Sequence, residues 1–141
     1  MVGNKILITL LIKRTICLGF NEMINNSITT PKYSELTSKL KAKKAVNIIN
    51  PLGKELAQMR NSILPSALEV VKFNVNRQSK NLKLFELGNT YEEFNGSYNE
   101  SKYLSLTLTG EVYNENWNIV KQPEVFFYFK GLINQLLGKN T

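Results

Sequence analysis

The fold is decided by residues 103–113, which have the sequence YLSLTLTGEVY. Apolar residues at positions 104, 106, 108 and 112 alternate with polar residues at positions 105, 107, 109 and 111. A period of two residues predicts a half-buried antiparallel strand. The stretch Leu82–Tyr91 is also strand-like, and Asn95-Gly96 begins a polar loop between the two segments. Together these features predict a long β-hairpin.

The rest of the chain predicts helices and shorter strands. Gly19 is placed to end a first helix, Thr30 to cap a second, and Ser62 to cap a third that accommodates Pro65 in its first turn. We expect helices over Lys5–Leu18, Pro31–Leu40 and Ile63–Arg77 and another from Pro123 onward, and strands over Phe20–Thr29 and Ala45–Ile49. We expect Leu56–Arg60 to form a separate short element, which could be a strand. This order predicts an α+β fold in which helices pack on an antiparallel sheet.

Three of the predicted helices carry apolar stripes. The long apolar side of Lys5–Leu18 is expected to be buried, with Cys17 in the core. The last helix needs a partner surface. Its apolar residues are Val125, Phe126, Phe129, Leu132, Ile133, Leu136 and Leu137, and the stripe on Ile63–Arg77 consists of Leu64, Leu68, Val71 and Val75. The apolar run Ile6–Ile12 ends at Lys13 and is too short for a membrane span.

Composition excludes several classes of site. The 141 residues include neither Asp nor His, which removes Ser-His and Cys-His nucleophile pairs, imidazole zinc sites and the usual carboxylate sites for magnesium or calcium. Glycines occur singly, so no phosphate-binding glycine motif is present. The single cysteine cannot form an internal disulfide and indicates a reduced, cytoplasmic protein. We expect one domain over residues 1–141.

The net charge of +7 lies entirely in the first 60 residues. Its densest cluster is Lys39, Lys41, Lys43 and Lys44, which could contact the phosphates of a nucleic acid or form a solvated connection between two elements. Only three arginines occur, and this weakens the direct evidence for nucleic-acid binding.

Three acidic residues and one tryptophan are candidates for a functional role. Glu86 is the best lone carboxylate, although a structural pairing with Lys83 or exposure to water is the favoured interpretation. Glu92 and Glu93 are expected to be solvated loop charges. Trp117 fits either a surface anchor or a core position.

Six short motifs resemble the bacterial phenylalanine–tRNA ligase beta subunit, in the order expected of its catalytic-like core domain. They are GFNE (19–22), NPL (50–52), MRNSILP (59–65), NVNR (74–77), LFELG (84–88) and FKG (129–131). Two positions depart from the family pattern, since Asn61 stands where Thr is common and Ser66 where Gly often follows the proline.

The resemblance implies a class II synthetase-like antiparallel sheet flanked by helices. It also implies that this domain is not the active site and binds no cofactor itself, whereas the whole enzyme uses ATP and magnesium. The implied partners are the alpha subunit, in an (αβ)₂ assembly, and tRNA(Phe) through that assembly, with no membrane. Because the family protein is several times longer, we expect a fragment truncated on its C-terminal side.

The resemblance also places interface residues near the third predicted helix, which is similar to the first class II motif. Arg60, Ser62, Leu64, Pro65 and Leu68 are expected to form or support the contact with the alpha subunit, although Leu64 and Leu68 also fit ordinary core positions. No arginine follows Arg77, so the hairpin and the last helix lack the residue that class II sites use to hold ATP phosphates. The alternative function is a tRNA-contacting module that uses the Lys39–Lys44 surface.

Overall fold

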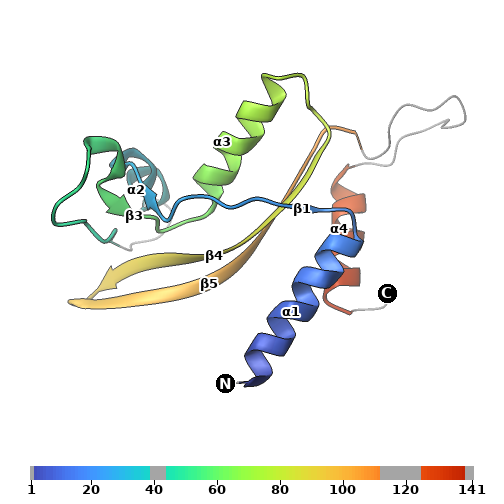
Figure 1. Ribbon diagram of the computed structural model, residues 1–141, viewed down its shortest axis with the longest axis horizontal. Coiled ribbons are helices and arrows are strands. Elements are labelled where there is room, and N and C mark those ends of the chain that lie inside the picture. The colour runs from blue at the N-terminus through green and yellow to red at the C-terminus, as the bar shows by residue number, and fades with distance from the viewer. Residues whose placement is uncertain (1, 39–43, 112–124, 139–141) are drawn as a thin grey trace, which may run out of the picture. The chain divides into compact units, whose positions relative to one another are not determined.

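A computed structural model describes residues 2–38, 44–111 and 125–138. It contains the predicted hairpin, formed by strands β4 (Leu82–Phe94) and β5 (Ser97–Thr109), which are labelled in Figure 1. The predicted polar loop is a two-residue turn, because Asn95 and Gly96 both adopt positive φ, at 50° and 76°. Positive φ at both positions is the type I′ geometry that matches the twist of paired strands. The hairpin is therefore confirmed. Its second strand begins earlier than expected, at Ser97, and the expected extension past Thr109 is wrong at Gly110 and Glu111.

The chain divides into two compact units, each of which contains part of the hairpin. The first unit consists of Met1–Glu22, Asn74–Phe85 and Leu106–Thr141. The second consists of Met23–Phe73 and Glu86–Ser105.

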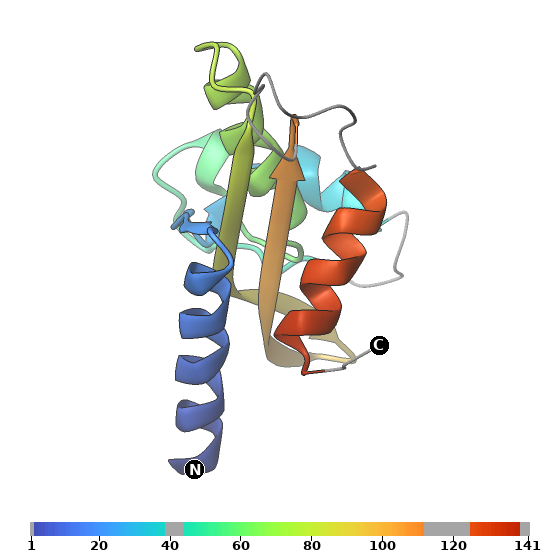
Figure 2. The same ribbon diagram turned by 90° about the vertical axis from the view of Figure 1, so that its right-hand side faces the viewer.

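In the first unit, helix α1 (Val2–Cys17) contacts helix α4 (Val125–Leu136), and Figure 2 shows both beside the hairpin strands. The Arg14 side chain donates a hydrogen bond to the Leu136 carbonyl at 3.3 Å. Strand β1 (Asn21–Glu22) pairs in parallel with β4, with Asn21 opposite Leu84, and this gives a three-stranded sheet of order β1-β4-β5. The core of this unit consists of Phe20, Leu82, Leu84, Phe85, Leu132 and Leu136.

Helix α1 confirms the first predicted helix, and Gly19 ends it with φ of 83°. The expected burial of its apolar side is wrong for the described residues, because Ile6, Leu7, Leu10 and Ile16 are all about half exposed. The fully buried side chain of α1 is Thr15, whose hydroxyl donates to the Leu11 carbonyl at 2.7 Å. Cys17 is exposed, so its expected core position is also wrong.

In the second unit, helix α2 (Pro31–Ser38), the 3₁₀ turn η1 (Lys54–Leu56) and helix α3 (Leu64–Val75) accompany a small sheet. Strands β2 (Ile28–Thr29) and β3 (Gln58–Met59) form it as an antiparallel pair. The apolar core of the unit consists of Met23, Ala45, Ile63 and Ala67. The short element expected over Leu56–Arg60 is confirmed as η1 followed by β3.

Two predicted strands are wrong in extent. The strand expected over Phe20–Thr29 is broken into β1 and β2, since between them the Asn26 side chain accepts a hydrogen bond from the Ile28 amide, which turns the chain. The strand expected over Ala45–Ile49 is reduced to isolated bridges at Lys44 and Asn47. Trp117 and Pro123 lie outside the described residues.

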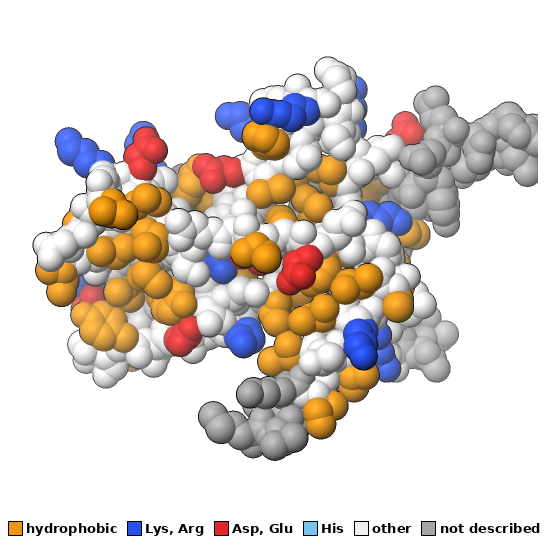
Figure 3. All heavy atoms as spheres, viewed as in Figure 1, with side chains coloured by type: hydrophobic (Ala, Val, Ile, Leu, Met, Phe, Trp, Pro, Cys, Tyr) orange, Lys and Arg blue, Asp and Glu red, His pale blue; other side chains and the backbone are white. Residues whose placement is uncertain are grey.

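None of the described helices is long and apolar enough to cross a membrane. Hydrophobic side chains are nevertheless exposed over α1 and α3 (Figure 3).

Candidate functional site

The candidate site is centred on the start of α3, where the predicted interface residues lie. The Ser62 hydroxyl accepts a hydrogen bond from the Leu64 amide at 3.3 Å. The first helical hydrogen bond is accepted by the Ile63 carbonyl, so the predicted cap at Ser62 is wrong by one residue. Pro65 then falls in the first turn, where a missing amide hydrogen costs nothing. The Ser62 hydroxyl thus satisfies the first free amide of the helix, and Pro65 has no amide hydrogen to satisfy.

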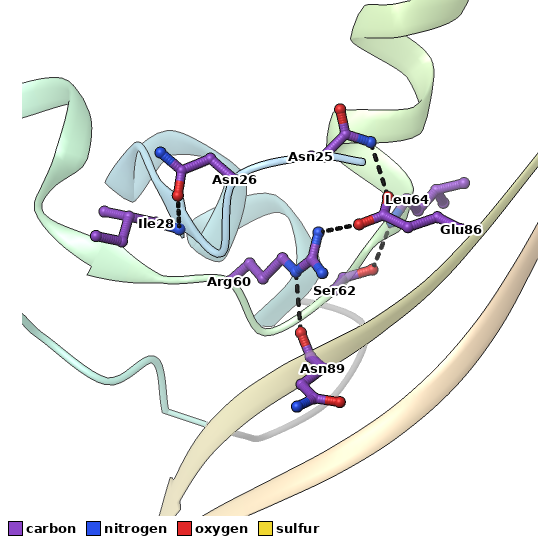
Figure 4. A network of polar contacts seen from close by, with 8 residues as sticks. All are labelled: Asn25, Asn26, Ile28, Arg60, Ser62, Leu64, Glu86 and Asn89. Atoms are coloured by element: carbon purple, nitrogen blue, oxygen red, sulfur yellow. Dashed lines mark hydrogen bonds and ion pairs between the residues drawn. The ribbon is translucent and has the colours of Figure 1, made fainter. Parts of the chain in front are cut away.

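Arg60, just before this helix, is buried, with 3% of its surface exposed (Figure 4). Its Nη1 lies 2.6 Å from Glu86 Oε1, and its Nε donates to the Asn89 carbonyl at 2.9 Å. Its backbone amide donates to the Ser27 carbonyl, and its own carbonyl accepts from the Tyr91 amide, each at 2.9 Å. The Arg60 side chain can thus hold the entrance of α3 against β4, but it is not available to contact another protein directly.

Glu86 completes this buried network. It is 3% exposed, and its second carboxylate oxygen accepts a hydrogen bond from Asn25 Nδ2 at 2.7 Å. The expected pairing with Lys83, or exposure to water, is wrong, because Arg60 neutralises Glu86. Lys83 instead donates to the Tyr128 hydroxyl at 2.8 Å. A carboxylate with both oxygens occupied in this way is a structural group.

The outer face of α3 is apolar and accessible. Leu64 and Leu68 are 58% and 56% exposed, and Val75, on the same side of the helix, is 36% exposed. The buried residues at the base of the helix are Ile63 and Ala67. The core interpretation of Leu64 and Leu68 is therefore excluded for the described part of the chain. An exposed apolar stripe of this kind is typical of a protein-binding surface.

The basic surface is described only at Lys44, because Lys39, Lys41 and Lys43 lie outside the described residues. Lys44 is exposed, and its Nζ lies 3.5 Å from Glu93 Oε1. Glu93 is thus an ion-pair partner, and Glu92 is buried, so neither is the solvated loop charge that we expected. The lysine cluster as a tRNA contact stays a prediction.

An open pocket of about 850 Å³ lies in the second unit. Residues of β2, α2, η1 and α3 line it, and the Tyr33 hydroxyl donates a hydrogen bond to Glu69 on its wall. This hydrogen bond raises the pKa of Tyr33 above its ordinary value, with smaller contributions from burial and from the charges of Glu69 and Glu55. Among the described residues no group of three His, Cys, Asp or Glu residues could hold a metal ion.

Comparison with known families gives a match along nearly the whole chain. The family model described as "Phenylalanyl tRNA synthetase beta chain CLM domain" matches residues 5–140. The phenylalanine–tRNA ligase beta subunit of Bacteroides fragilis is 33% identical over 130 residues, which cover 86% of this chain and 16% of that protein. The beta subunit of Geobacter sulfurreducens is 36% identical over 124 residues, which cover 84% of this chain and 16% of that protein. The chain thus spans about 16% of the length of these relatives.

Two solved structures share the fold. The pyrrolysyl tRNA synthetase PylSc of Desulfitobacterium hafniense aligns with a TM-score of 0.66 and 19% identity over 94% of this chain and 45% of its own. An ATP phosphoribosyltransferase regulatory subunit/histidyl-tRNA synthetase of Bacillus halodurans aligns with a TM-score of 0.70 and 11% identity over 96% of this chain and 33% of its own. These similarities confirm the expected α+β fold of the class II synthetase type.

Proposed function

Because the chain belongs to the family of phenylalanyl-tRNA synthetase beta chain CLM domains, we propose that it acts in the ligase beta subunit as a non-catalytic domain that docks on the alpha subunit. The whole assembly, an (αβ)₂ tetramer in the cytoplasm, would attach phenylalanine to tRNA(Phe) with ATP and magnesium. This domain would help to assemble the subunits and would not itself catalyse a step of the reaction.

The exposed apolar face of α3 is the observation that carries the docking role. Leu64 and Leu68 lie one helical turn apart on it, and both are more than half exposed. Burying a leucine side chain stabilises an association by about 1.5–3 kcal/mol, so two such residues can anchor a partner. Below this face, the Arg60–Glu86 pair supports the start of the helix.

The arginines support the non-catalytic role. Arg60 is buried against Glu86, Arg14 donates to the Leu136 carbonyl, and no arginine follows Arg77 in the sequence. A guanidinium group binds phosphate with two parallel hydrogen bonds, which lysine cannot reproduce. The β4–β5 hairpin therefore offers no guanidinium group to an ATP triphosphate.

We expect Leu68→Glu in the complete beta subunit to weaken its association with the cognate alpha subunit at least tenfold, because a charge would replace a buried leucine. Sedimentation velocity of the mixed subunits measures this. Ile49→Glu is the matched control, since Ile49 is an exposed apolar residue outside α3. An unchanged tetramer with Leu68→Glu would show that α3 does not form the contact.

We expect the isolated 141-residue chain to catalyse no phenylalanine-dependent exchange of pyrophosphate into ATP. The reason is the lack of guanidinium groups on the hairpin. The assay is run with the chain alone, with the alpha subunit alone and with both. Exchange by the chain alone would contradict the non-catalytic role while leaving the docking role open to the sedimentation test.

A further inference from the structure

The turn of the β4–β5 hairpin contains a reactive pair of residues. Asn95-Gly96 is the single asparagine–glycine pair in the sequence, and both residues are exposed. The side-chain amide of an asparagine can be attacked by the backbone nitrogen of the next residue, and glycine hinders this attack least because it has no Cβ. The turn consists of residues 94–97 alone, so its geometry is set locally by the two strands that it joins.

Both reacting groups are free to react. In the part of the chain that the structure describes, the Asn95 side chain forms no hydrogen bond and the Gly96 amide donates none. Apart from its chain neighbours, a Cβ built on Gly96 would meet nothing within 4 Å, so the space beside its nitrogen is open. Asn26 differs, although the small residue Ser27 follows it, because its side-chain oxygen accepts a hydrogen bond from the Ile28 amide at 3.1 Å.

Rotation of one peptide plane brings the two groups together. In the observed type I′ turn the first central residue has ψ of about +30°, which directs the Gly96 nitrogen away from the Asn95 Cβ. Rotating the peptide between the two residues gives a type II′ turn, with ψ of about −120°. At that angle the nitrogen eclipses Cβ, because the substituents of a tetrahedral Cα lie about 120° apart. Both turn types suit a two-residue hairpin, so β4 and β5 can stay paired during the rotation.

We propose that Asn95 is a site of spontaneous deamidation in the folded chain, reached through the type II′ form of the turn. Asparagine is strained in that form, which therefore occupies roughly 0.1–10% of molecules. The Gly96 nitrogen bonds to Asn95 Cγ and gives up its proton through water, while the Cγ–Nδ2 bond breaks and ammonia leaves. Water then opens the resulting succinimide at either carbonyl, which gives aspartate or isoaspartate at position 95.

Either product changes the tip of the hairpin. Both place a new carboxylate two residues from Glu93, whose own carboxylate lies 3.5 Å from Lys44 Nζ. Isoaspartate also adds a methylene group to the backbone of a turn that matches the strands only at its present length, so it should loosen the pairing of Phe94 with Ser97. The modification uses the hairpin tip and not α3, and is therefore independent of the proposed docking on the alpha subunit.

Peptide mapping measures the reaction at each asparagine. The folded chain is incubated at mildly alkaline pH, and cleavage by trypsin after Lys83 and Lys102 then releases Asn95 and Asn99 in one peptide. We expect Asn95 to convert at least about tenfold faster than Asn99 or Asn26, because it alone of the three precedes a glycine. An isoaspartyl methyltransferase supplied with labelled S-adenosylmethionine distinguishes isoaspartate from aspartate.

Exchanging the two residues tests the role of the glycine nitrogen. The variant Asn95→Gly/Gly96→Asn keeps the composition, and glycine followed by asparagine also forms two-residue hairpin turns. The amide after the asparagine is then that of Ser97, which is hydrogen-bonded to Phe94 in the ladder of such a hairpin. We expect deamidation at least about tenfold slower than at Asn95 in the wild type. Circular dichroism checks that the variant is folded.

A destabilised variant tests whether the reaction occurs in folded molecules. Arg60→Lys weakens the buried pair with Glu86 and does not alter the turn. If Asn95 reacted only in unfolded molecules, its rate should rise roughly 5–30-fold with the unfolded fraction. Rotation of a peptide plane within the folded hairpin predicts instead a rate within about twofold of the wild type, since the opening is local.

Three outcomes would overturn the proposal. The first is an Asn95 that converts no faster than Asn99. The second is an exchanged pair that deamidates as fast as the wild type. The third is a rate in Arg60→Lys that rises in proportion to the unfolded fraction. Preferential conversion of Asn95 that is lost on exchange and unchanged in Arg60→Lys would support it.

Discussion

Replacing Arg60 by alanine is expected to lower the free energy of unfolding of the chain by about 3–5 kcal/mol, the usual cost of removing one partner from a buried ion pair. Arg60 is 3% exposed, and its guanidinium group lies 2.6 Å from Glu86 and bonds the Asn89 carbonyl. Without it, the Glu86 charge would remain buried with Asn25 as a neutral partner. Urea unfolding followed by circular dichroism measures the loss.

Two further variants keep this prediction testable if Arg60→Ala does not fold. Arg60→Lys retains the charge but not the planar group, and should lose about 1–2 kcal/mol. The double replacement Arg60→Met/Glu86→Leu removes both charges and should be more stable than Arg60→Ala. Lys44→Ala is the control, because it breaks the exposed pair with Glu93 and should cost less than about 1 kcal/mol. Equal losses for Arg60→Ala and Lys44→Ala would contradict a structural role for the buried pair.

The same change tests how Arg60 supports the interface. In the complete beta subunit, Arg60→Ala should weaken association with the alpha subunit by displacing the start of α3, since Arg60 itself is not on the surface. Leu68→Glu should weaken association without a comparable loss of stability. Sedimentation and urea unfolding are measured on both variants. Together they distinguish a residue that stabilises the start of α3 from a residue that contacts the alpha subunit directly.

The hairpin could be predicted because its signals are local. Alternation along Tyr103–Thr109 and the Asn95-Gly96 turn depend only on neighbouring residues. The end of α1 at Gly19 was predictable for the same reason, and the start of α3 was predicted to within one residue. Six motifs that span the chain indicated the family, and the match of the family model over residues 5–140 confirms that resemblance.

The pairing of Arg60 with Glu86 could not be predicted, because it joins residues 26 positions apart. One signal pointed to it, namely a carboxylate placed between Phe85 and Leu87 in an apolar strand. Such a position requires a buried cation, but several lysines and arginines were equally available in the sequence. Nor does an apolar stripe indicate what covers it. Ile6 and Leu68 follow helical periodicity and are nevertheless exposed.

Replacing Gly88 by alanine is expected to destabilise the chain by about 1–3 kcal/mol, the usual cost of inserting a methyl group into a packed interior. A Cβ at this position would lie 2.1 Å from Arg60 Nη2 and 3.1 Å from Glu86 Oε1. A flexible arginine could normally move aside. Here Nη1 is held by Glu86 and Nε by the Asn89 carbonyl, so the guanidinium group cannot move without breaking the buried pair.

A double-mutant cycle attributes that cost to Arg60. In an Arg60→Met background the guanidinium group is absent, so adding Gly88→Ala should cost at least 1 kcal/mol less than it does in the wild type, as expected for residues in contact. Gly53→Ala is the matched control, because nothing lies within 4 Å of its Cβ position and its φ of −174° suits any residue. It should leave the stability unchanged or slightly raised. Strict additivity of Gly88→Ala and Arg60→Met in urea unfolding would show that the glycine is not required by the arginine.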